Sequence, residues 1–249
     1  MPKNAHAMLL RAIGLAALLA GAGGPPALAA PIPVALELVL AVDASGSVSE
    51  QEFELQMRGL ADAFRDPQVV AAIAGAGPGG IAVALVQWSS PGQQVVAVDW
   101  LKVSDAASAG ALAARIDAAG RLIQGETAID GALRFSLELL ASADFASRRR
   151  IIDLSGDGQT NWGPDPDEER DRVVAAGVTI NALAVVNEQP HLGGYYRKHV
   201  IGGPDCFVMT AADYADFARA IRLKLIREIG NAPIAGTPAG RTTVAGSAQ

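Results

Sequence analysis

The sequence predicts an α/β fold: a three-layer, doubly wound domain with a mostly parallel six-stranded sheet, one antiparallel edge strand and helices on both faces. Along residues 33–230, apolar runs of strand length alternate with segments of helical periodicity, which is typical of such sheets. Hydrophobic residues make up 50% of the chain, enough for a sizeable core. We therefore expect one domain of ordinary size.

The expected strands are the six apolar runs that lie between breakers. A short link that contains Ser89-Ser90-Pro91-Gly92 joins the second run to the third, so these two strands form an antiparallel hairpin with the third at the sheet edge. The other strands, each followed by a helical segment, are expected to be parallel. The strands are predicted at residues 34–42, 81–88, 95–101, 150–155, 178–185 and 206–209.

The helices are marked by capping residues and by apolar periodicity. The first is expected to begin at Ser49, because Ser49 and Glu52 form a capping-box pattern. Apolar residues then recur at helical spacing from Phe53 to Phe64. Further helices are predicted at residues 67–73, 105–119, 128–141, 167–176 and 213–229.

The two ends of the chain differ from the middle. Residues 1–29 hold Lys3 and Arg11, a short apolar stretch and the small-residue ending Ala27-Leu28-Ala29, the order of a secretory signal peptide. We expect cleavage after Ala29 and a periplasmic or secreted protein, with a disordered or membrane-retained N-terminus as the alternative. The mature chain has no stretch of about 20 apolar residues that would span a membrane. Residues 231–249, rich in Gly, Ala, Thr and Pro, are expected to be disordered.

Charge and cysteine content narrow the possible partners. Removal of residues 1–29 would change the formal net charge from −6 to −8, because that segment carries two basic and no acidic residues. We expect no nucleic-acid binding, since there is no basic stripe to replace condensed counterions. Cys206 is the single cysteine, which excludes an internal disulfide. We expect a monomer, and pairing of two chains through Cys206 is the alternative.

Oxygen-bearing side chains follow the first strand. Asp43, Ser45 and Ser47 alternate in a short turn that contains Gly46. Carboxylate and hydroxyl oxygens are the hard donors that Mg²⁺ or Mn²⁺ prefers. The competing interpretation is that these residues only cap the next helix, but Ser49 is better placed for that role.

Two later junctions carry matching residues. Thr127 precedes a helix, and Asp157 follows an apolar strand. In a doubly wound sheet the carboxyl ends of the strands meet at one edge, so we expect these segments to join residues 43–47 there. Taken singly, Thr127 could be a helix N-cap and Asp157 part of a turn.

Together the three segments resemble the von Willebrand factor type A domain and its metal-ion-dependent adhesion site. This resemblance implies that Ser45, Ser47 and Thr127 ligate a divalent ion directly, while Asp43 and Asp157 hold it largely through water. The loop at residues 191–203 is similar to a secreted bacterial subgroup of that superfamily, a domain of unknown function of the DUF1194 type.

Other polar and aromatic residues surround this predicted site. Asp153 lies inside a strand, on the same face as Ser155 and Asp157; it either supports the metal site or pairs with an arginine. Trp162, Tyr195 and Tyr196 lie in loops expected beside the ion, where aromatic side chains either contact a partner or pack the loops.

The leading functional hypothesis is a binding module without catalytic activity, in which a Glu or Asp of a partner protein completes the coordination of the ion. The alternative is a metal-dependent hydrolase or phosphoryl-transfer enzyme. Against it, the sequence has no G-x-S-x-G motif, no Walker loop and no second carboxylate cluster. A structural domain with an unused metal site is the third possibility.

Overall fold

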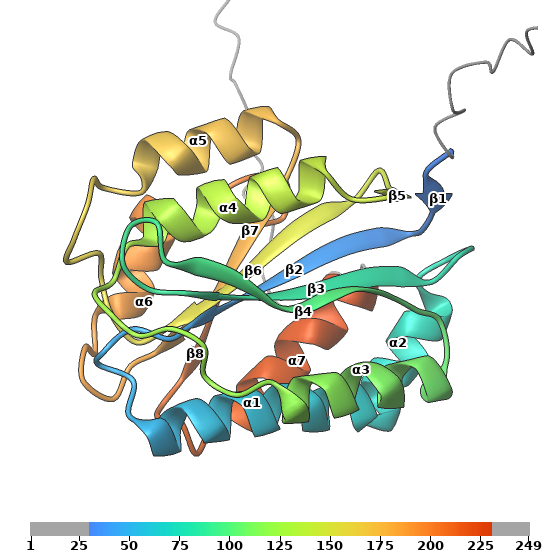
Figure 1. The fold of residues 1–249 in the computed structure, drawn as a ribbon, viewed down its shortest axis with the longest axis horizontal. Coiled ribbons are helices and arrows are strands. Elements are labelled where there is room, and N and C mark those ends of the chain that lie inside the picture. Colours follow the sequence, from blue (N-terminus) through green and yellow to red (C-terminus); the bar gives the residue numbers. More distant parts are fainter. Residues whose placement is uncertain (1–29, 231–249) are drawn as a thin grey trace, which may run out of the picture. The chain divides into compact units, whose positions relative to one another are not determined.

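The computed structural model describes residues 30–230, and its centre is a six-stranded sheet (Figure 1). The strand order is β4-β3-β2-β6-β7-β8, and all neighbours are parallel except β3 and β4. The predicted fold class is confirmed. The strands are β2 (Leu36–Asp43), β3 (Ile81–Trp88), β4 (Gln94–Val103), β6 (Arg150–Gly156), β7 (Thr179–Val185) and β8 (Val208–Ala211).

Helices cover both faces of the sheet, as Figure 1 shows. One face carries α1 (Glu50–Arg65), α2 (Pro67–Gly75), α3 (Ala106–Ala118) and α7 (Phe217–Gly230). The other face carries α4 (Ile129–Ala141), α5 (Asp167–Ala175) and the short α6 (Leu192–Tyr195). Each face has its own hydrophobic core, so the sheet is buried on both sides.

The central strand β2 shows how the sequence produces this arrangement. All eight of its residues are buried. Leu38 and Leu40 belong to the core under α1 and α7, while Val39 and Ala41 belong to the core under α4 and α5, because side chains alternate along a strand. A strand buried on both faces therefore appears in the sequence as a continuous apolar run.

The strand order reverses at β2. The chain crosses from β2 to β3 on one side, and β6 later packs on the other side of β2. Ligands of doubly wound sheets bind beyond the carboxyl ends of the strands where the order reverses in this way. Asp43, the last residue of β2, lies at that point.

The structure differs from the sequence-based predictions in some details. The last strand begins at Val208 instead of residue 206, because the N–H of Phe207 donates to Asn181 Oδ1. The last helix begins at Phe217 instead of residue 213. A two-stranded pair formed by β1 (Ile32–Pro33) and β5 (Phe145–Ala146) was not predicted, nor was the π-helical turn η1 (Tyr196–Val200) that follows α6.

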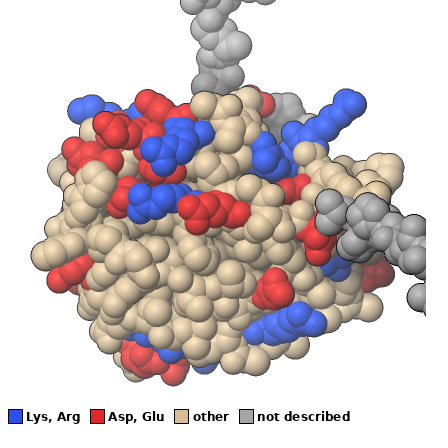
Figure 2. All heavy atoms as spheres, turned by 45° about the horizontal axis from the view of Figure 1, so that its top comes forward, with Lys and Arg blue, Asp and Glu red and all other residues tan. Residues whose placement is uncertain are grey.

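The predictions for residues 1–29 and 231–249 lie outside the described residues. Within residues 30–230, no helix is both long enough and apolar enough to cross a membrane. Figure 2 shows positive and negative side chains side by side near the helices of the upper face of Figure 1. Among the charged residues of α5 and α4, Arg172 forms an ion pair with Glu169, and Arg134 forms one with Asp130.

Candidate metal centre

Asp43 forms the floor of the candidate site. Its side chain is fully buried, and its Oδ1 accepts a hydrogen bond of 2.8 Å from the N–H of Ser45. Its Oδ2 is also buried but has no hydrogen-bond partner within residues 30–230. A Cβ atom on Gly156 would lie 2.8 Å from this oxygen, so the glycine at the end of β6 makes room for the carboxylate. A buried carboxylate oxygen without a partner is costly and indicates that something else satisfies it.

A chain of hydroxyls connects the turn after β2 to the end of β6. Ser45 Oγ lies 3.1 Å from Ser47 Oγ, which donates to Asp157 Oδ1 at 2.9 Å. Ser45 and Asp157 are buried, whereas Ser47 is exposed. The site therefore reaches the protein surface on the side of Ser47.

Ser49 is the N-cap of α1, as the sequence predicts. Its hydroxyl accepts from the N–H of Glu52, and the Glu52 carboxylate accepts from the N–H of Ser49, which completes the capping box. Because Ser49 fulfils this role, the three preceding polar residues are free for another one.

Thr127 lies beside the turn at residues 43–47. The N–H of Gly46 donates to the carbonyl of Gly125 at 2.6 Å, which ties the two loops together. The N–H of Thr127 donates to Asn161 Oδ1, and the N–H of Asn161 donates back to the Thr127 carbonyl. The alternative role of Thr127 as a helix N-cap is wrong, because Ala128 occupies that position without a side-chain cap. All three predicted segments therefore meet at one edge of the sheet, at the left in Figure 1.

The electrostatics of the site follow from two buried carboxylates close together. Burial raises the pKa of Asp43 from its ordinary 3.8 to about 7, and the charge of Asp157 adds to the rise. The pKa of Asp157 is also raised, mainly by burial. Within residues 30–230, no Lys, Arg or His side chain forms an ion pair with either carboxylate. A cation bound between the two carboxylates would offset both the burial of their charges and the repulsion between them.

The donor set fits a hard divalent cation. The predicted donors are two carboxylates and three hydroxyls, and small cations such as Mg²⁺ prefer oxygen ligands. The Thr127 hydroxyl would lie 3.8 Å from a Cβ atom on Gly158, the residue after Asp157. Among the described residues, no cluster of three or more His, Cys, Asp or Glu side chains is arranged to hold a metal. The candidate site is thus not of the zinc type rich in His and Cys, and three of its five side chains are neutral.

The three aromatic residues expected to contact a partner have different environments. Trp162 is 61% exposed, and its backbone N–H donates to the carbonyl of Thr127, so its indole lies at the surface next to the site. Tyr196 is fully buried, and its hydroxyl donates to the carbonyl of Gly158. The expectation that Tyr196 contacts a partner is wrong in this structure, because it packs under the Asp157 turn. Tyr195 is half-buried and stacks against His199.

A buried glutamine lies behind Asp43 and was not predicted from the sequence. Gln56 of α1 donates to the carbonyl of Asp43 and accepts from the hydroxyl of Ser155, so it joins α1 to β2 and β6. Gln56 falls on the apolar face of α1, three residues after Phe53. Its position could have been noticed in the sequence, because a polar residue on the apolar face of an amphipathic helix needs a buried hydrogen-bond partner.

Asp153 is explained by a lysine of α7. Its Oδ1 lies 2.5 Å from Nζ of Lys224, which also contacts Glu228 Oε1 at 2.6 Å. Asn181 Nδ2 donates to the same glutamate oxygen. All four side chains are buried. The expected arginine partner is therefore a lysine, and this ion pair joins Asp153 to α7 instead of to the candidate metal ligands.

The comparisons with known proteins agree with this arrangement. A family model described as "Protein of unknown function (DUF1194)" matches residues 33–233. The chain belongs to the DUF1194 family. A comparison with curated proteins gives no match.

Solved structures with the same fold are much more distant in sequence. The pilus adhesin SpaC of Lactobacillus rhamnosus GG matches with a TM-score of 0.60 and 16% identity, over 79% of this chain and 31% of that one. Proximal thread matrix protein 1 of the mussel byssus matches with 0.57 and 19%, over 78% and 46%. A von Willebrand factor type A protein of Catenulispora acidiphila matches with 0.54 and 16%, over 78% and 42%.

These matches establish the fold, which is that of a von Willebrand factor type A domain. The chain spans less than half the length of each of the three proteins. Another structure of the mussel protein, at a TM-score of 0.51 and 20% identity, is described with a zinc-occupied metal-ion-dependent adhesion site (MIDAS) motif.

Proposed function

We propose that this DUF1194 protein is a binding module that holds a divalent cation with Asp43, Ser45, Ser47, Thr127 and Asp157 and uses it to bind an acidic side chain of a partner protein. The observation that carries the proposal is a pair of buried carboxylates without a cationic side chain in the described part of the chain, beside three hydroxyls at the switch point of the sheet. The likeness of the fold to a pilus adhesin and a thread matrix protein supports a role in adhesion.

Mg²⁺ or Mn²⁺ is the ion that we propose, since all the donors are oxygens. When bound, the ion would supply a positive centre to which an external carboxylate is attracted. The hydroxyls carry no charge, so the protein itself offers at most two negative charges against the two positive charges of the ion. The pKa of Asp43 is raised to about 7, so this carboxyl is partly protonated near neutral pH, and the pKa of Asp157 is also raised, mainly by burial. Metal binding must therefore displace protons.

We further propose that the partner approaches on the side of Ser47 and Trp162. Ser47 is exposed, and Trp162 presents a large exposed indole, while its backbone N–H donates to the Thr127 carbonyl. Exposed aromatic residues beside a polar centre are typical anchors of protein interfaces. Export to the periplasm or the cell exterior, as the N-terminal sequence predicts, would place the module where adhesins act.

Affinity capture tests the proposal. The mature protein, used as bait on periplasmic and secreted fractions, is expected to retain a partner with Mg²⁺ and to release it with chelator. A Thr127→Ala bait is expected to retain none, whereas Thr179→Ala, at the opposite end of a strand, serves as a matched control. Replacement of single acidic residues of the captured partner should then identify one whose loss abolishes Mg²⁺-dependent binding.

Two results would contradict the proposal. Equal retention of the partner with Mg²⁺ and with chelator would show that the ion is not needed for binding. Turnover of a small ester or phosphate substrate that depends on both Mg²⁺ and Asp43 would favour the enzyme hypothesis instead.

A further inference from the structure

Arg121 occupies an unusual position next to the candidate metal centre. It lies in the segment between α3 and α4, and its side chain is only 8% exposed. The guanidinium donates to the carbonyls of Val48, Ala44 and Ser45 at 2.8, 2.8 and 2.5 Å. One side chain thus holds three carbonyls of the turn that also carries Ser45 and Ser47.

The backbone of Arg121 is itself fixed to the sheet. Gln87, a buried residue of β3, donates to the carbonyl of Gly120 and accepts from the N–H of Leu122. These two bonds flank Arg121 on both sides. The guanidinium therefore reaches the turn from an anchored base and not from a free loop, which lowers the entropic cost of holding it in place.

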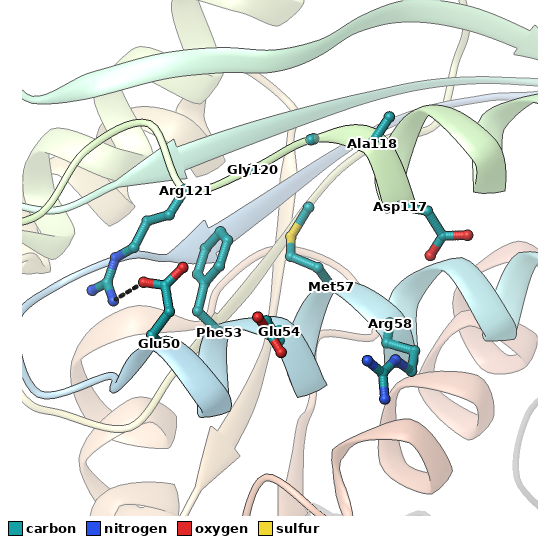
Figure 3. Close-up of a pocket in the computed structure, with 10 residues that line it drawn as sticks. Glu50, Phe53, Glu54, Met57, Arg58, Asp117, Ala118, Gly120 and Arg121 are labelled. Carbon is teal, nitrogen blue, oxygen red and sulfur yellow. Dashed lines mark ion pairs between the residues drawn. The ribbon is translucent and has the colours of Figure 1, made fainter.

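The ring of Phe53 and the carboxylate of Glu50 complete the setting. The guanidinium lies over the Phe53 ring at 5.4 Å, and Glu50 Oε2 lies 3.8 Å from Nη1. These residues belong to α1 and form part of the wall of a hollow of about 410 Å³ between α1 and the end of α3 (Figure 3). Stacking and ion pairing keep the planar group in one orientation.

We infer that Arg121 is a positioning residue for the candidate metal centre: by holding the carbonyls of the turn at residues 44–48, it directs the hydroxyls of Ser45 and Ser47 toward Asp157. This inference rests on the proposed metal-binding function. The same segment reaches the turn a second time through the Gly125 carbonyl and then supplies Thr127. Arg121 thus fixes two of the three ligand-bearing segments relative to each other without touching the ion.

The substitution Arg121→Met tests the inference because it keeps the aliphatic stem and removes all donors. Residues that orient metal ligands typically change metal affinity by about 10-fold to 100-fold when replaced. We expect the Kd for Mn²⁺ to rise by about that factor, measured by calorimetry on chelator-treated protein. Arg121→Lys retains the charge with fewer donors, so its Kd should lie between those of the wild type and Arg121→Met.

Arg149 provides a matched control. Its guanidinium also donates to two backbone carbonyls, those of Glu228 and Ile229, but at the C-terminal end of α7. Arg149→Met should lower the Tm of the metal-free protein as Arg121→Met does and leave the Kd for Mn²⁺ unchanged. This difference separates positioning of the metal site from a general loss of stability.

The outcomes distinguish this inference from the proposed function. Binding of Mn²⁺ by the wild type with an unchanged Kd in Arg121→Met would overturn the positioning role alone. Equal weakening by Arg121→Met and Arg149→Met would overturn it as well. Absence of Mn²⁺ binding in the wild type would overturn both. If Arg121→Met does not fold, an unchanged Kd in Arg121→Lys decides against the inference, and a raised Kd supports it.

Discussion

Two pairs of buried carboxyl groups, one between the sheet and α7 and one at the carboxyl ends of β2 and β6, differ in their cationic partners. Asp153 and Glu228 share the ammonium group of Lys224, which lies 2.5 and 2.6 Å from their oxygens. Asp43 and Asp157, at the carboxyl ends of β2 and β6, have no such partner within residues 30–230. The hydroxyls of Ser45 and the exposed Ser47 lie beside this second pair instead.

The two environments indicate different roles. The first cluster has a resident cation, Lys224, although Asp153 Oδ2 and Glu228 Oε2 have no hydrogen-bond partner within residues 30–230. This ion pair and the bond from Asn181 join α7 to β6 and β7. The second cluster has no cationic side chain within residues 30–230, so binding of an external cation can stabilise its carboxylates. Fully buried charge without a partner is too costly to serve only stability. The comparison therefore supports a structural role for one pair and a metal-binding role for the other.

Removal of the resident lysine should have the largest effect. Lys224→Met leaves the Asp153 carboxylate without its cation in the core, and breaking a buried ion pair in this way costs about 3 to 5 kcal/mol. We expect a corresponding fall in the free energy of unfolding, measured with urea. Arg222→Met on the same helix, where the side chain is 31% exposed, should cost less than about 1 kcal/mol. Equal losses of unfolding free energy in the two variants would contradict a stabilising role of the Lys224 ion pairs.

The lysine cluster should also make stability depend on pH. Burial and the charge of Asp153 raise the pKa of Glu228 from its ordinary 4.5 to about 8. Between these values the folded protein holds a proton that the unfolded chain has released, so this group's contribution to stability falls as pH rises toward 8. The slope is at most about 1.4 kcal/mol per pH unit.

The isosteric variant Glu228→Gln isolates this contribution. Its amide oxygen can still accept from Lys224 and Asn181, but the side chain cannot ionise. The difference in unfolding free energy between wild type and variant, measured from pH 5 to pH 9, should change in the variant's favour as pH rises. A constant difference would show that Glu228 is ionised throughout.

In the open cluster, loss of a carboxylate should stabilise the metal-free protein. Asp157→Asn removes the repulsion of Asp43 and keeps an acceptor for Ser47, so chelator-treated protein should gain about 1 kcal/mol, the equivalent of one pKa unit or less. With Mg²⁺ present the order should reverse, because only the wild type gains binding energy. Thermal unfolding with and without the ion checks both signs. A loss of stability without metal would mean that the carboxylate has a structural role like that of Asp153.

The smallest effect is expected at the exposed aromatic residue beside the open cluster. Trp162→Ala should leave the Tm and the Mg²⁺ affinity within error, because the indole is 61% exposed and surface changes cost about 0.5 kcal/mol or less. Binding of the captured partner should nevertheless weaken. A partner affinity equal to that of the wild type would move the interface away from this side of the site.

The sequence predicts the sheet and the open cluster but not the closed one. Apolar runs and capping residues are local signals, so the class of sheet and the helix at Ser49 follow from them. Asp43 and Asp157 are visible because polar residues at strand ends collect at one edge. Pairing of Asp153 with Lys224 is not visible, because it requires knowing that α7 covers β6.

The direction of side chains in loops is the second feature that the sequence does not predict. No periodic pattern marks the segment around Gly193 and Gly194, so neither α6 nor η1 could be predicted. The sequence also left open whether Tyr196 contacts a partner or packs its loop, and its burial decides for packing. Arg121 shows the same limit. Three of its carbonyl partners lie 73 to 77 residues earlier in the chain.

Calorimetric titration of Mg²⁺ into chelator-treated protein decides whether the open cluster is a metal site. We expect saturable binding of one ion by the wild type and by Thr179→Ala. Binding should be lost in Asp43→Asn, which keeps the shape of the side chain and the acceptor for the Ser45 N–H. A binding isotherm in Asp43→Asn equal to that of the wild type would contradict the metal-binding role, as would the lack of saturable binding of both Mg²⁺ and Mn²⁺ to the wild type.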